Sequence, residues 1–244
     1  MSSSHVVIIP GAWMSAFYFD IVKSKLESLG YNVHVRQMPA VGATDPPQDL
    51  SRDVAAARSL VEDAIGDGND VVVIAHSWGG IVAGTGLTGL GKKERAAEGK
   101  KGGITRVGYI AAFLVPEGTS LIDAVGGTVP AAFDVKGPYV YAKDPGAIYN
   151  DLSASEQQFF YSKQQSHSFA TFTTKTTAAS WRQIPTSYLL CEDDGGLPAL
   201  AQEAMIKGVQ DAGGDIEVRR MKVGHFPFLS QPDETVKWIE TVPR

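Results

Sequence analysis

The chain has 244 residues, a single cysteine and a formal net charge of -5, and 43% of its residues are hydrophobic. One cysteine excludes an internal disulfide, the apolar fraction excludes a disordered chain, and the mild acidity argues against nucleic acid or an anionic membrane as the main partner. The longest nearly apolar stretch, Ile104–Val115, is shorter than the about 18 residues of a membrane-spanning helix. Met1–Ser4 leads into the apolar His5–Ile9 without a basic segment, so no secretory signal is predicted and we expect a cytoplasmic protein.

Strand-like and helix-like segments alternate along most of the chain. The predicted strands are short apolar runs bounded by polar residues, Gly or Pro, and two of them alternate polar and apolar residues as outer strands do. In chain order they are Val6–Ile9, Asn32–Gln37, Val71–Ala75, Val107–Ala111, Ser187–Cys191 and Glu217–Met221, the second and the last being the outer pair. The predicted helices are Phe17–Leu29, Leu50–Ile65, Gly79–Leu90, Pro198–Ala212 and Pro232–Thr241. This order predicts an α/β fold with a mostly parallel sheet flanked by helices.

Two segments interrupt the alternation. Gly91–Gly103 is basic, but two glutamates interrupt it and it contains no aromatic residue, so we predict a solvated loop or a fraying helix end rather than a nucleic-acid patch. Pro116–Trp181 is rich in Gly, Pro, Ser, Thr and aromatic residues and is too long for a simple loop. We predict that residues 116–181 form a helical cap inserted into a core made of residues 1–115 and 182–244.

The segment Val71–Gly80 carries the strongest chemical signal. It reads VVVIAHSWGG, so a buried strand runs into a small-X-Ser-X-Gly turn directly before a predicted helix. Such a turn lifts the Ser77 hydroxyl above the strand end, and the next backbone N–H, that of Trp78, faces a developing oxyanion. The first small residue is Ala75 rather than glycine, which adds only a methyl group. Ser77 is therefore the predicted nucleophile and Trp78 a predicted oxyanion donor.

A serine nucleophile needs a histidine base, which in this architecture follows the last strand. His225 is the histidine beyond the last predicted strand, in a loop containing Gly and Pro before the final helix. His5 and His34 lie in predicted strands and are interpreted as structural. His76 is the X residue of the serine turn and is expected to point away from the nucleophile. His167 falls in the insertion, where a pocket position and a surface position are both open.

The base needs an orienting acid, which should follow the strand Ser187–Cys191. Three carboxylates follow it in the sequence Glu-Asp-Asp-Gly-Gly-Leu-Pro. Asp194 lies where the chain leaves the strand and turns, so it is the predicted acid, and Asp193 is the alternative. Cys191, which closes the strand, is predicted to be buried and structural. Because nucleophile, acid and base all follow strands of one sheet, we predict a single domain overall.

A second oxyanion donor should come from the turn after the first strand, Pro10-Gly-Ala-Trp-Met. Gly11 permits a tight turn, and the Ala12 N–H is placed to point into the site. The chain has no G-x-G-x-x-G and no glycine-rich loop ending in Lys-Ser/Thr, so a nucleotide site is not predicted. Aromatic residues of the insertion are sufficient for an apolar pocket, although most of them are expected in the insertion's own core. Our predicted pocket residues are Trp13, His167 and Phe226.

These motifs together resemble the α/β-hydrolase superfamily, and within it the compact group of plant methylesterases and hydroxynitrile lyases with fungal and bacterial relatives. The resemblance covers most of the chain outside the insertion. It rests on Val7–Trp13, Pro39–Gly42, Ala75–Gly80, Tyr109–Pro116, Tyr188–Pro198 and Gly224–Pro232. It implies that Ser77 is the nucleophile, Asp194 the acid and His225 the base. The family's His-Gly oxyanion turn is Pro10–Gly11 in this chain, a departure that leaves the Ala12 N–H unaffected.

The resemblance also separates two activities. Hydroxynitrile lyases of this group carry a lysine after the catalytic histidine and a threonine in the oxyanion turn, where this chain has Phe226 and Ala12. Phenylalanine supplies no positive charge to a leaving cyanide, so that lyase activity is not expected. We expect a serine carboxylesterase or lactonase that cleaves a small, largely apolar ester or lactone without a metal or an organic cofactor. The alternatives are a non-hydrolytic enzyme of secondary metabolism that cleaves C–C bonds or cyclises, and a slow ligand-binding receptor. No nucleic-acid or membrane partner is expected, and a homodimer is left open.

Overall fold

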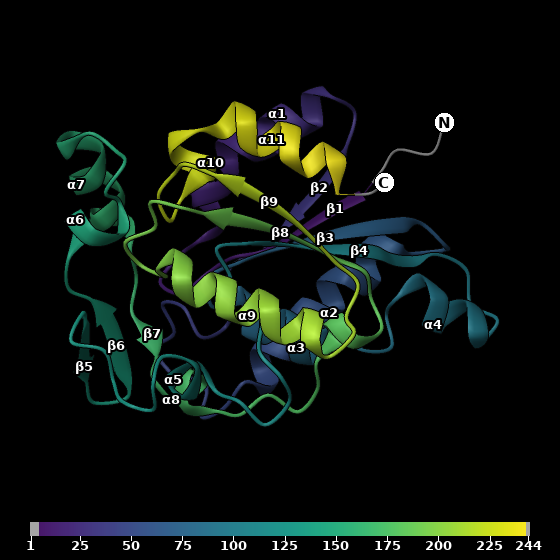
Figure 1. Cartoon of the computed structure of the whole chain (residues 1–244), viewed down its shortest axis with the longest axis horizontal. Coiled ribbons are helices and arrows are strands. Elements are labelled where there is room, and N and C mark those ends of the chain that lie inside the picture. Colours follow the sequence, from purple (N-terminus) through teal and green to yellow (C-terminus); the bar gives the residue numbers. More distant parts are fainter. Residues whose placement is uncertain (1–4, 243–244) are drawn as a thin grey trace.

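The computed structural model describes residues 5–242, so Met1–Ser4, on which the prediction about a secretory signal depends, lie outside the described residues. Within this range, strands in parallel pairs form a central sheet in the order β2-β1-β3-β4-β8-β9 (Figure 1). These strands are β1 (His5–Ile9), β2 (Asn32–Val35), β3 (Asp70–His76), β4 (Gly103–Ile110), β8 (Thr186–Cys191) and β9 (Ile216–Met221). Each predicted strand is confirmed, and the two that alternate polar and apolar residues are the outer strands.

Helices cover both faces of this sheet. One face packs against α1 (Asp20–Ser28), α10 (Pro227–Ser230) and α11 (Pro232–Thr241), and the other against α2 (Ser51–Ile65), α3 (Gly79–Gly86) and α9 (Ala199–Asp211) (Figure 1). Side chains alternate between the two cores along a strand, as the pleat requires: Val6 and Ile8 lie in the first, and Val7 and Ile9 in the second. The predicted α/β architecture is therefore confirmed. A short 3-10 helix, η1 (Ala16–Phe19), takes the first turn of the predicted helix Phe17–Leu29.

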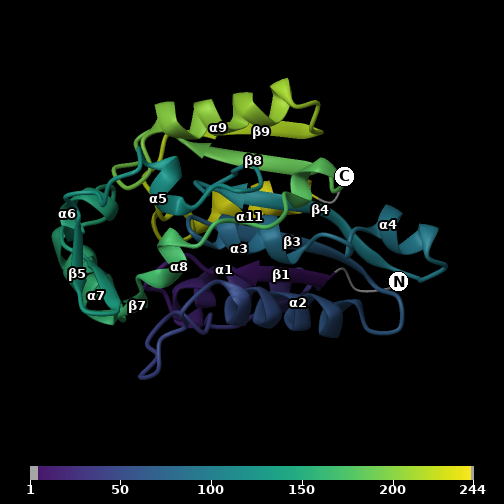
Figure 2. The same ribbon diagram turned by 90° about the horizontal axis from the view of Figure 1, so that it is seen from below.

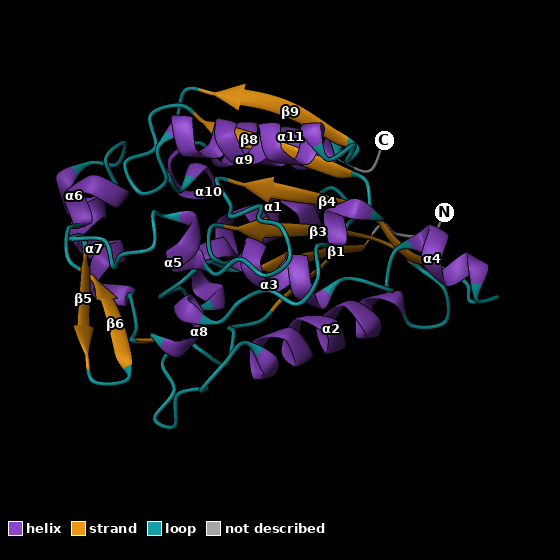
Figure 3. Cartoon of the chain, turned by 60° about the horizontal axis from the view of Figure 1, so that its bottom comes forward, coloured by secondary structure: helices purple, strands orange, loops and turns teal. Residues whose placement is uncertain are grey.

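The insertion between β4 and β8 differs from the helical cap that we predicted. It contains short helices, α5 (Leu121–Ala124), α6 (Pro145–Ile148), α7 (Ala154–Lys163), α8 (Ala170–Thr173) and the 3-10 helix η2 (Ser180–Arg182). It also contains an antiparallel sheet of β5 (Phe133–Lys136), β6 (Tyr139–Ala142) and β7 (His167–Ser168). Figure 3 shows the hairpin of β5 and β6 beside the helices of the insertion. Phe133–Lys136 and Tyr139–Ala142 flank the turn residue Gly137, which has a φ of 59°. This hairpin signal in the sequence contradicts a purely helical cap.

The insertion lies across the end of the sheet toward which β8 points (Figure 2). That end is the carboxyl end of the parallel strands, where open α/β sheets bind their ligands. At the opposite end, the basic segment predicted as a loop or fraying helix carries α4 (Lys92–Ala97), in which no side chain is buried. Among residues 5–242, none of the helices has the length and apolar character needed to cross a membrane.

Candidate active site

Ser77 lies on a strained turn at the carboxyl end of β3. Its φ of 51° falls in the left-handed region that residues with a side chain rarely adopt. Two residues later α3 begins at Gly79, where an added Cβ would lie 2.6 Å from the carbonyl oxygen of Ile9. The close approach of β1 to this helix therefore explains the glycine, and the turn holds the Ser77 hydroxyl above the strand end, as its sequence predicted.

Three side chains from three loops form one chain of hydrogen bonds at this point. The Ser77 Oγ lies 3.0 Å from the Nε2 of His225, and the Nδ1 of His225 lies 2.7 Å from the Oδ2 of Asp194. The Asp194 carboxylate is an acceptor, so the Nδ1 of His225 carries the proton and its Nε2 is left to accept the proton of Ser77. The alternative acid, Asp193, has an exposed side chain and does not take part in this series of hydrogen bonds. The structure thus brings together Ser77, His225 and Asp194.

The two predicted oxyanion donors face the same place. Ala12 and Trp78 both line the cavity beside Ser77, and neither backbone N–H donates a hydrogen bond to another of the described residues. Buried backbone N–H groups without partners are rare, because each one loses its bond to water on folding. These two N–H groups are therefore free to donate to a negatively charged oxygen that develops on a substrate bound at Ser77.

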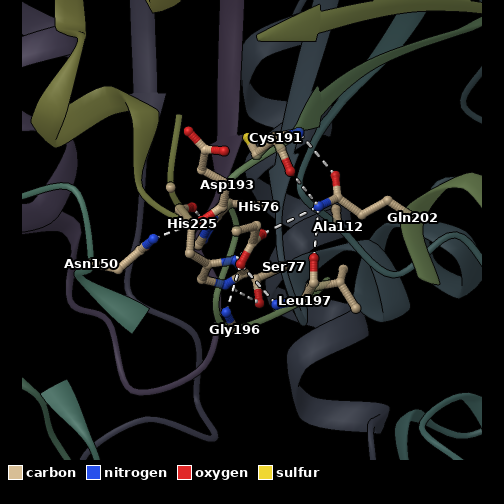
Figure 4. Close-up of polar contacts among 12 residues, drawn as sticks. His76, Ser77, Ala112, Asn150, Cys191, Asp193, Gly196, Leu197, Gln202 and His225 are labelled. Carbon is tan, nitrogen blue, oxygen red and sulfur yellow. Dashed lines mark hydrogen bonds and ion pairs between the residues drawn. The ribbon is translucent and has the colours of Figure 1, made fainter. Parts of the chain in front are cut away.

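The loop that carries Asp194 is held by its own neighbours in sequence. The Oδ1 of Asp194 accepts hydrogen bonds from the backbone N–H groups of Gly196 (2.7 Å) and Leu197 (2.8 Å). Gln202, on the first turns of α9, donates to the carbonyl oxygens of Leu197 and Cys191 and accepts from the Cys191 N–H (Figure 4). Cys191 itself is buried, as predicted, and burial raises the pKa of its thiol, so the thiol is unreactive.

The loop that carries His225 is held by residues far away in sequence. The carbonyl oxygen of His225 accepts a 2.9 Å hydrogen bond from the Nε2 of His76, the residue before the nucleophile. Burial and the nearby His225 keep the pKa of His76 well below its usual value, so its ring stays neutral. On the other side, Asp151 of the insertion accepts from the N–H of Gly224 (2.8 Å) and the hydroxyl of Ser230 (2.6 Å).

Asn150, next to Asp151, reaches the other catalytic loop. Its Nδ2 donates a 2.7 Å hydrogen bond to the carbonyl oxygen of Asp193 (Figure 4). Two consecutive residues of the insertion therefore form hydrogen bonds with the loops that carry Asp194 and His225. The insertion lies over the candidate site and is also hydrogen-bonded to these two loops.

The cavity at Ser77 is small and apolar, with a volume of about 110 Å³. Its walls combine core residues beside the serine with side chains of the insertion. The insertion contributes Leu121, Val125, Pro130, Ala132, Phe133 and Ile148. No Asp, Glu, Lys or Arg belongs to this lining among the described residues, so the cavity offers no partner to a charged group on a substrate.

Two of the three predicted pocket residues line this cavity, and the third does not. Trp13 and Phe226 are part of the wall. His167 is fully buried outside it, with its ring 4.5 Å from that of Trp78 and its Nε2 3.0 Å from the Thr171 hydroxyl. That hydroxyl donates to a backbone carbonyl, so it accepts from His167, and burial lowers the pKa of His167 to about 3. Both positions that the sequence left open for His167, in the pocket and on the surface, are therefore wrong.

Sequence reasoning missed the residues that hold the triad in place. Gln202 had a usable signal, because it precedes the buried Ile206 and Val209 by four and seven residues and so lies on the buried stripe of α9. A glutamine on such a stripe needs hydrogen-bond partners. Asn150 and Asp151 had no comparable signal, since the insertion has no periodic pattern from which their direction follows.

A parallel sheet with a serine on a strand–helix turn, and an acid and a histidine after the last two strands of the sheet, defines the class of α/β hydrolases. The Alpha/beta hydrolase family profile matches residues 6–238, so the chain belongs to this family. It is 30% identical over 240 residues to Alpha/beta hydrolase nvfD of Aspergillus novofumigatus. This alignment covers 96% of this chain and 94% of that protein.

Solved structures agree on the fold. Polyneuridine aldehyde esterase aligns over 100% of both chains with a TM-score of 0.77 and 19% identity. The methylesterase MES16 from Arabidopsis aligns over 97% of both chains with a TM-score of 0.71 and 19% identity. These likenesses show the fold, and the predicted membership of the α/β-hydrolase superfamily is confirmed.

Proposed function

We propose that the protein is a serine hydrolase that cleaves a small, largely apolar carboxylic ester or lactone through an acyl-enzyme. The observation that carries this proposal is the hydrogen-bonded chain Ser77–His225–Asp194, with distances of 3.0 and 2.7 Å, beside two unpartnered backbone N–H groups. A nucleophile, a base, an orienting acid and an oxyanion site are the complete set that acyl transfer from an ester needs.

In the proposed mechanism each step has its own group. His225 Nε2 takes the proton of Ser77 as the Oγ attacks the ester carbonyl carbon, and the N–H groups of Ala12 and Trp78 stabilise the oxygen as it becomes negative. Asp194 stabilises the resulting imidazolium, which then gives its proton to the leaving alkoxide, leaving an acyl group on Ser77. A water molecule, deprotonated by His225, attacks this acyl group. The carboxylic acid leaves, and the proton returns to Ser77.

The cavity sets the substrate class in this proposal. A lining without charged side chains favours an uncharged, apolar substrate over an acid, an amine or a phosphate. Two of the similar structures are named as esterases, polyneuridine aldehyde esterase and the methylesterase MES16, which favours ester chemistry among the reactions of the fold. Phe226 beside His225 supplies no charge for a leaving anion such as cyanide, which argues against lyase chemistry of that kind.

Hydrolysis of p-nitrophenyl acetate by the wild-type protein and by Ser77→Ala tests the proposal. We expect saturable hydrolysis by the wild type and a loss of about a millionfold in kcat for the variant, down to the spontaneous background. Equal hydrolysis by both proteins would overturn it. Wild-type protein that reacts once at Ser77 without turnover would instead favour the slow receptor.

A further inference from the structure

A second apolar cavity lies directly behind the wall of the catalytic one. It is an open groove with a volume of about 360 Å³ between α9 and the first residues of the insertion. One side is formed by α9, including Ala204, Met205 and Gly208, and the other by Leu114–Pro116 and Trp181. The one charged side chain in its described lining, Arg182, lies over the Trp181 ring with its guanidinium carbon 4.6 Å from the ring centre.

The groove and the catalytic cavity share two lining residues. Phe113 and Leu197 line both spaces, and each is almost fully buried. Helix α5 also borders both, because Leu121 faces the catalytic cavity and Ala124 faces the groove. The groove is therefore the next space that a molecule bound at Ser77 would meet in this direction.

The backbone of this partition is fixed by the catalytic centre itself. The Phe113 N–H donates to the Ser77 carbonyl oxygen at 3.0 Å, and the Leu197 N–H donates to the Asp194 carboxylate at 2.8 Å. These bonds do not hold the two side chains, and side chains change rotamer far more readily than a hydrogen-bonded backbone moves. Behind them lies Met205, whose unbranched side chain adapts readily to the shape of its neighbours.

Volume distinguishes the roles of the two spaces. Pockets that hold a molecule of about drug size measure roughly 300–1,000 Å³, so the catalytic cavity of about 110 Å³ holds little more than the reacting ester group. We propose that the groove is a distal subsite, which receives the longer apolar arm of a substrate ester whose carbonyl group is at Ser77. Phe113 and Leu197 act as the gate between the two. This inference rests on the proposed ester hydrolysis, and it replaces the small ester proposed above with one whose apolar arm extends beyond the catalytic cavity.

Filling the groove without touching the catalytic cavity tests this assignment. At Gly208 an added Cβ would meet no atom within 4 Å, so Gly208→Phe projects a ring into the groove without a backbone clash. Gln210→Phe is the matched control, because Gln210 is exposed on the same helix and does not line the groove. Each protein is assayed for kcat/KM with p-nitrophenyl acetate and dodecanoate, and with methyl and dodecyl acetate, so that either side of the ester is probed.

We expect the wild type to have a higher kcat/KM for the long ester than for the short ester in one of the two series. Gly208→Phe should lower kcat/KM for that long ester by about tenfold or more, the factor that corresponds to two methylene groups left unburied. It should leave kcat/KM for the two short esters, p-nitrophenyl acetate and methyl acetate, within about twofold of the wild type. Gln210→Phe should match the wild type for every ester. Leu197→Ala, which removes part of the gate, should raise the ratio of long-ester to short-ester kcat/KM if the Leu197 side chain limits access to the groove.

The outcomes separate the two proposals. If the two short esters are hydrolysed and Gly208→Phe leaves the chain-length preference of both series unchanged, the groove is not a subsite, while the proposed hydrolase function stands. If Gly208→Phe lowers all esters by the same factor, the groove affects the fold rather than the substrate, and the assignment again fails. If the folded wild type hydrolyses none of these esters, the proposed function itself is overturned, and the subsite with it.

Discussion

The acid loop after β8 and the base loop after β9 lie side by side, but they are held by different parts of the molecule. Asp194 is fixed within its own stretch of chain, by two N–H groups two and three residues later and by Gln202 eight residues later. His225 is fixed by His76, 149 residues away, while the adjacent Gly224 is fixed by Asp151, 73 residues away. The acid is thus preset by local sequence, whereas the base depends on the assembled fold.

This difference shows how the insertion enters the chemistry. Asp151 holds the residue before His225, and Asn150 holds the residue before Asp194, so a shift of the insertion moves the base more directly than the acid. The acid keeps its own carboxylate contacts whether or not Asn150 is present. Substitutions at Asp194, Asp151 and His76, each with a control, test this contrast between a locally held acid and a remotely held base. His167, which lies outside both loops, gives a further test.

The largest effect is expected at the acid. Asp194→Asn keeps the shape of the side chain but removes the charge that stabilises the imidazolium and orients its ring, so kcat should fall about ten-thousandfold. Asp193→Asn is the matched control next to it and should change kcat by less than about threefold, because its side chain is exposed. Steady-state kinetics with p-nitrophenyl acetate gives both values. If the two variants exchange these results, the acid is Asp193.

The next effect is expected at Asp151, the contact that holds the base loop from the insertion. Asp151→Ala leaves the Gly224 N–H unpaired and lets His225 shift, so kcat/KM should fall about 10- to 100-fold, as small misplacements of catalytic groups do. Asn150→Ala should cost less, since Asp194 retains its own contacts. The concentration of competent enzyme is set by titration with a fluorophosphonate, which separates mispositioning from simple unfolding. Equal losses in the two variants would remove the contrast between the loops.

A smaller effect is expected at His76, whose ring donates a hydrogen bond to the backbone of the base loop. His76→Ala removes the N–H that the His225 carbonyl accepts, and kcat/KM should fall by about tenfold, close to the worth of one buried hydrogen bond. His76→Gln retains a side-chain N–H donor and should recover part of the loss. If glutamine and alanine behave alike in kcat/KM, the hydrogen bond to His225 is not what His76 contributes.

The smallest effect on activity is expected at His167, which touches neither loop. Burial lowers its pKa to about 3. Between pH 6.5 and about 3, His167 therefore binds a proton in the unfolded chain but stays neutral in the folded chain. Stability conferred by its neutral form is complete above pH 6.5 and is lost as the pH falls through this window. His167→Gln should therefore reduce the slope of unfolding free energy against pH there, by up to about 1.4 kcal/mol per pH unit. Urea unfolding between pH 4 and 7 measures it, and an unchanged slope would contradict the buried, neutral assignment.

The same contrast explains what the sequence could predict. Residues close together in the chain determine the strands of the central sheet, the serine turn and the turn that follows Asp194. The sequence pattern alone therefore predicted where each of them lies. His225 was found because the order of motifs in this fold fixes it, not because of its own surroundings. The strands Phe133–Lys136 and Tyr139–Ala142 were missed because the turn signal at Gly137 between them was overlooked, whereas His167 was misplaced because packing across the insertion decides its position. Nothing local in the sequence records that packing.

Reaction with a fluorophosphonate followed by mass spectrometry tests whether His225 activates Ser77 for covalent chemistry. We expect one adduct per chain on the peptide that contains Ser77, none in Ser77→Ala, and a rate of labelling reduced by orders of magnitude in His225→Ala. Labelling of Ser77→Ala at the wild-type rate, or an unmodified Ser77 in active wild-type protein, would contradict it.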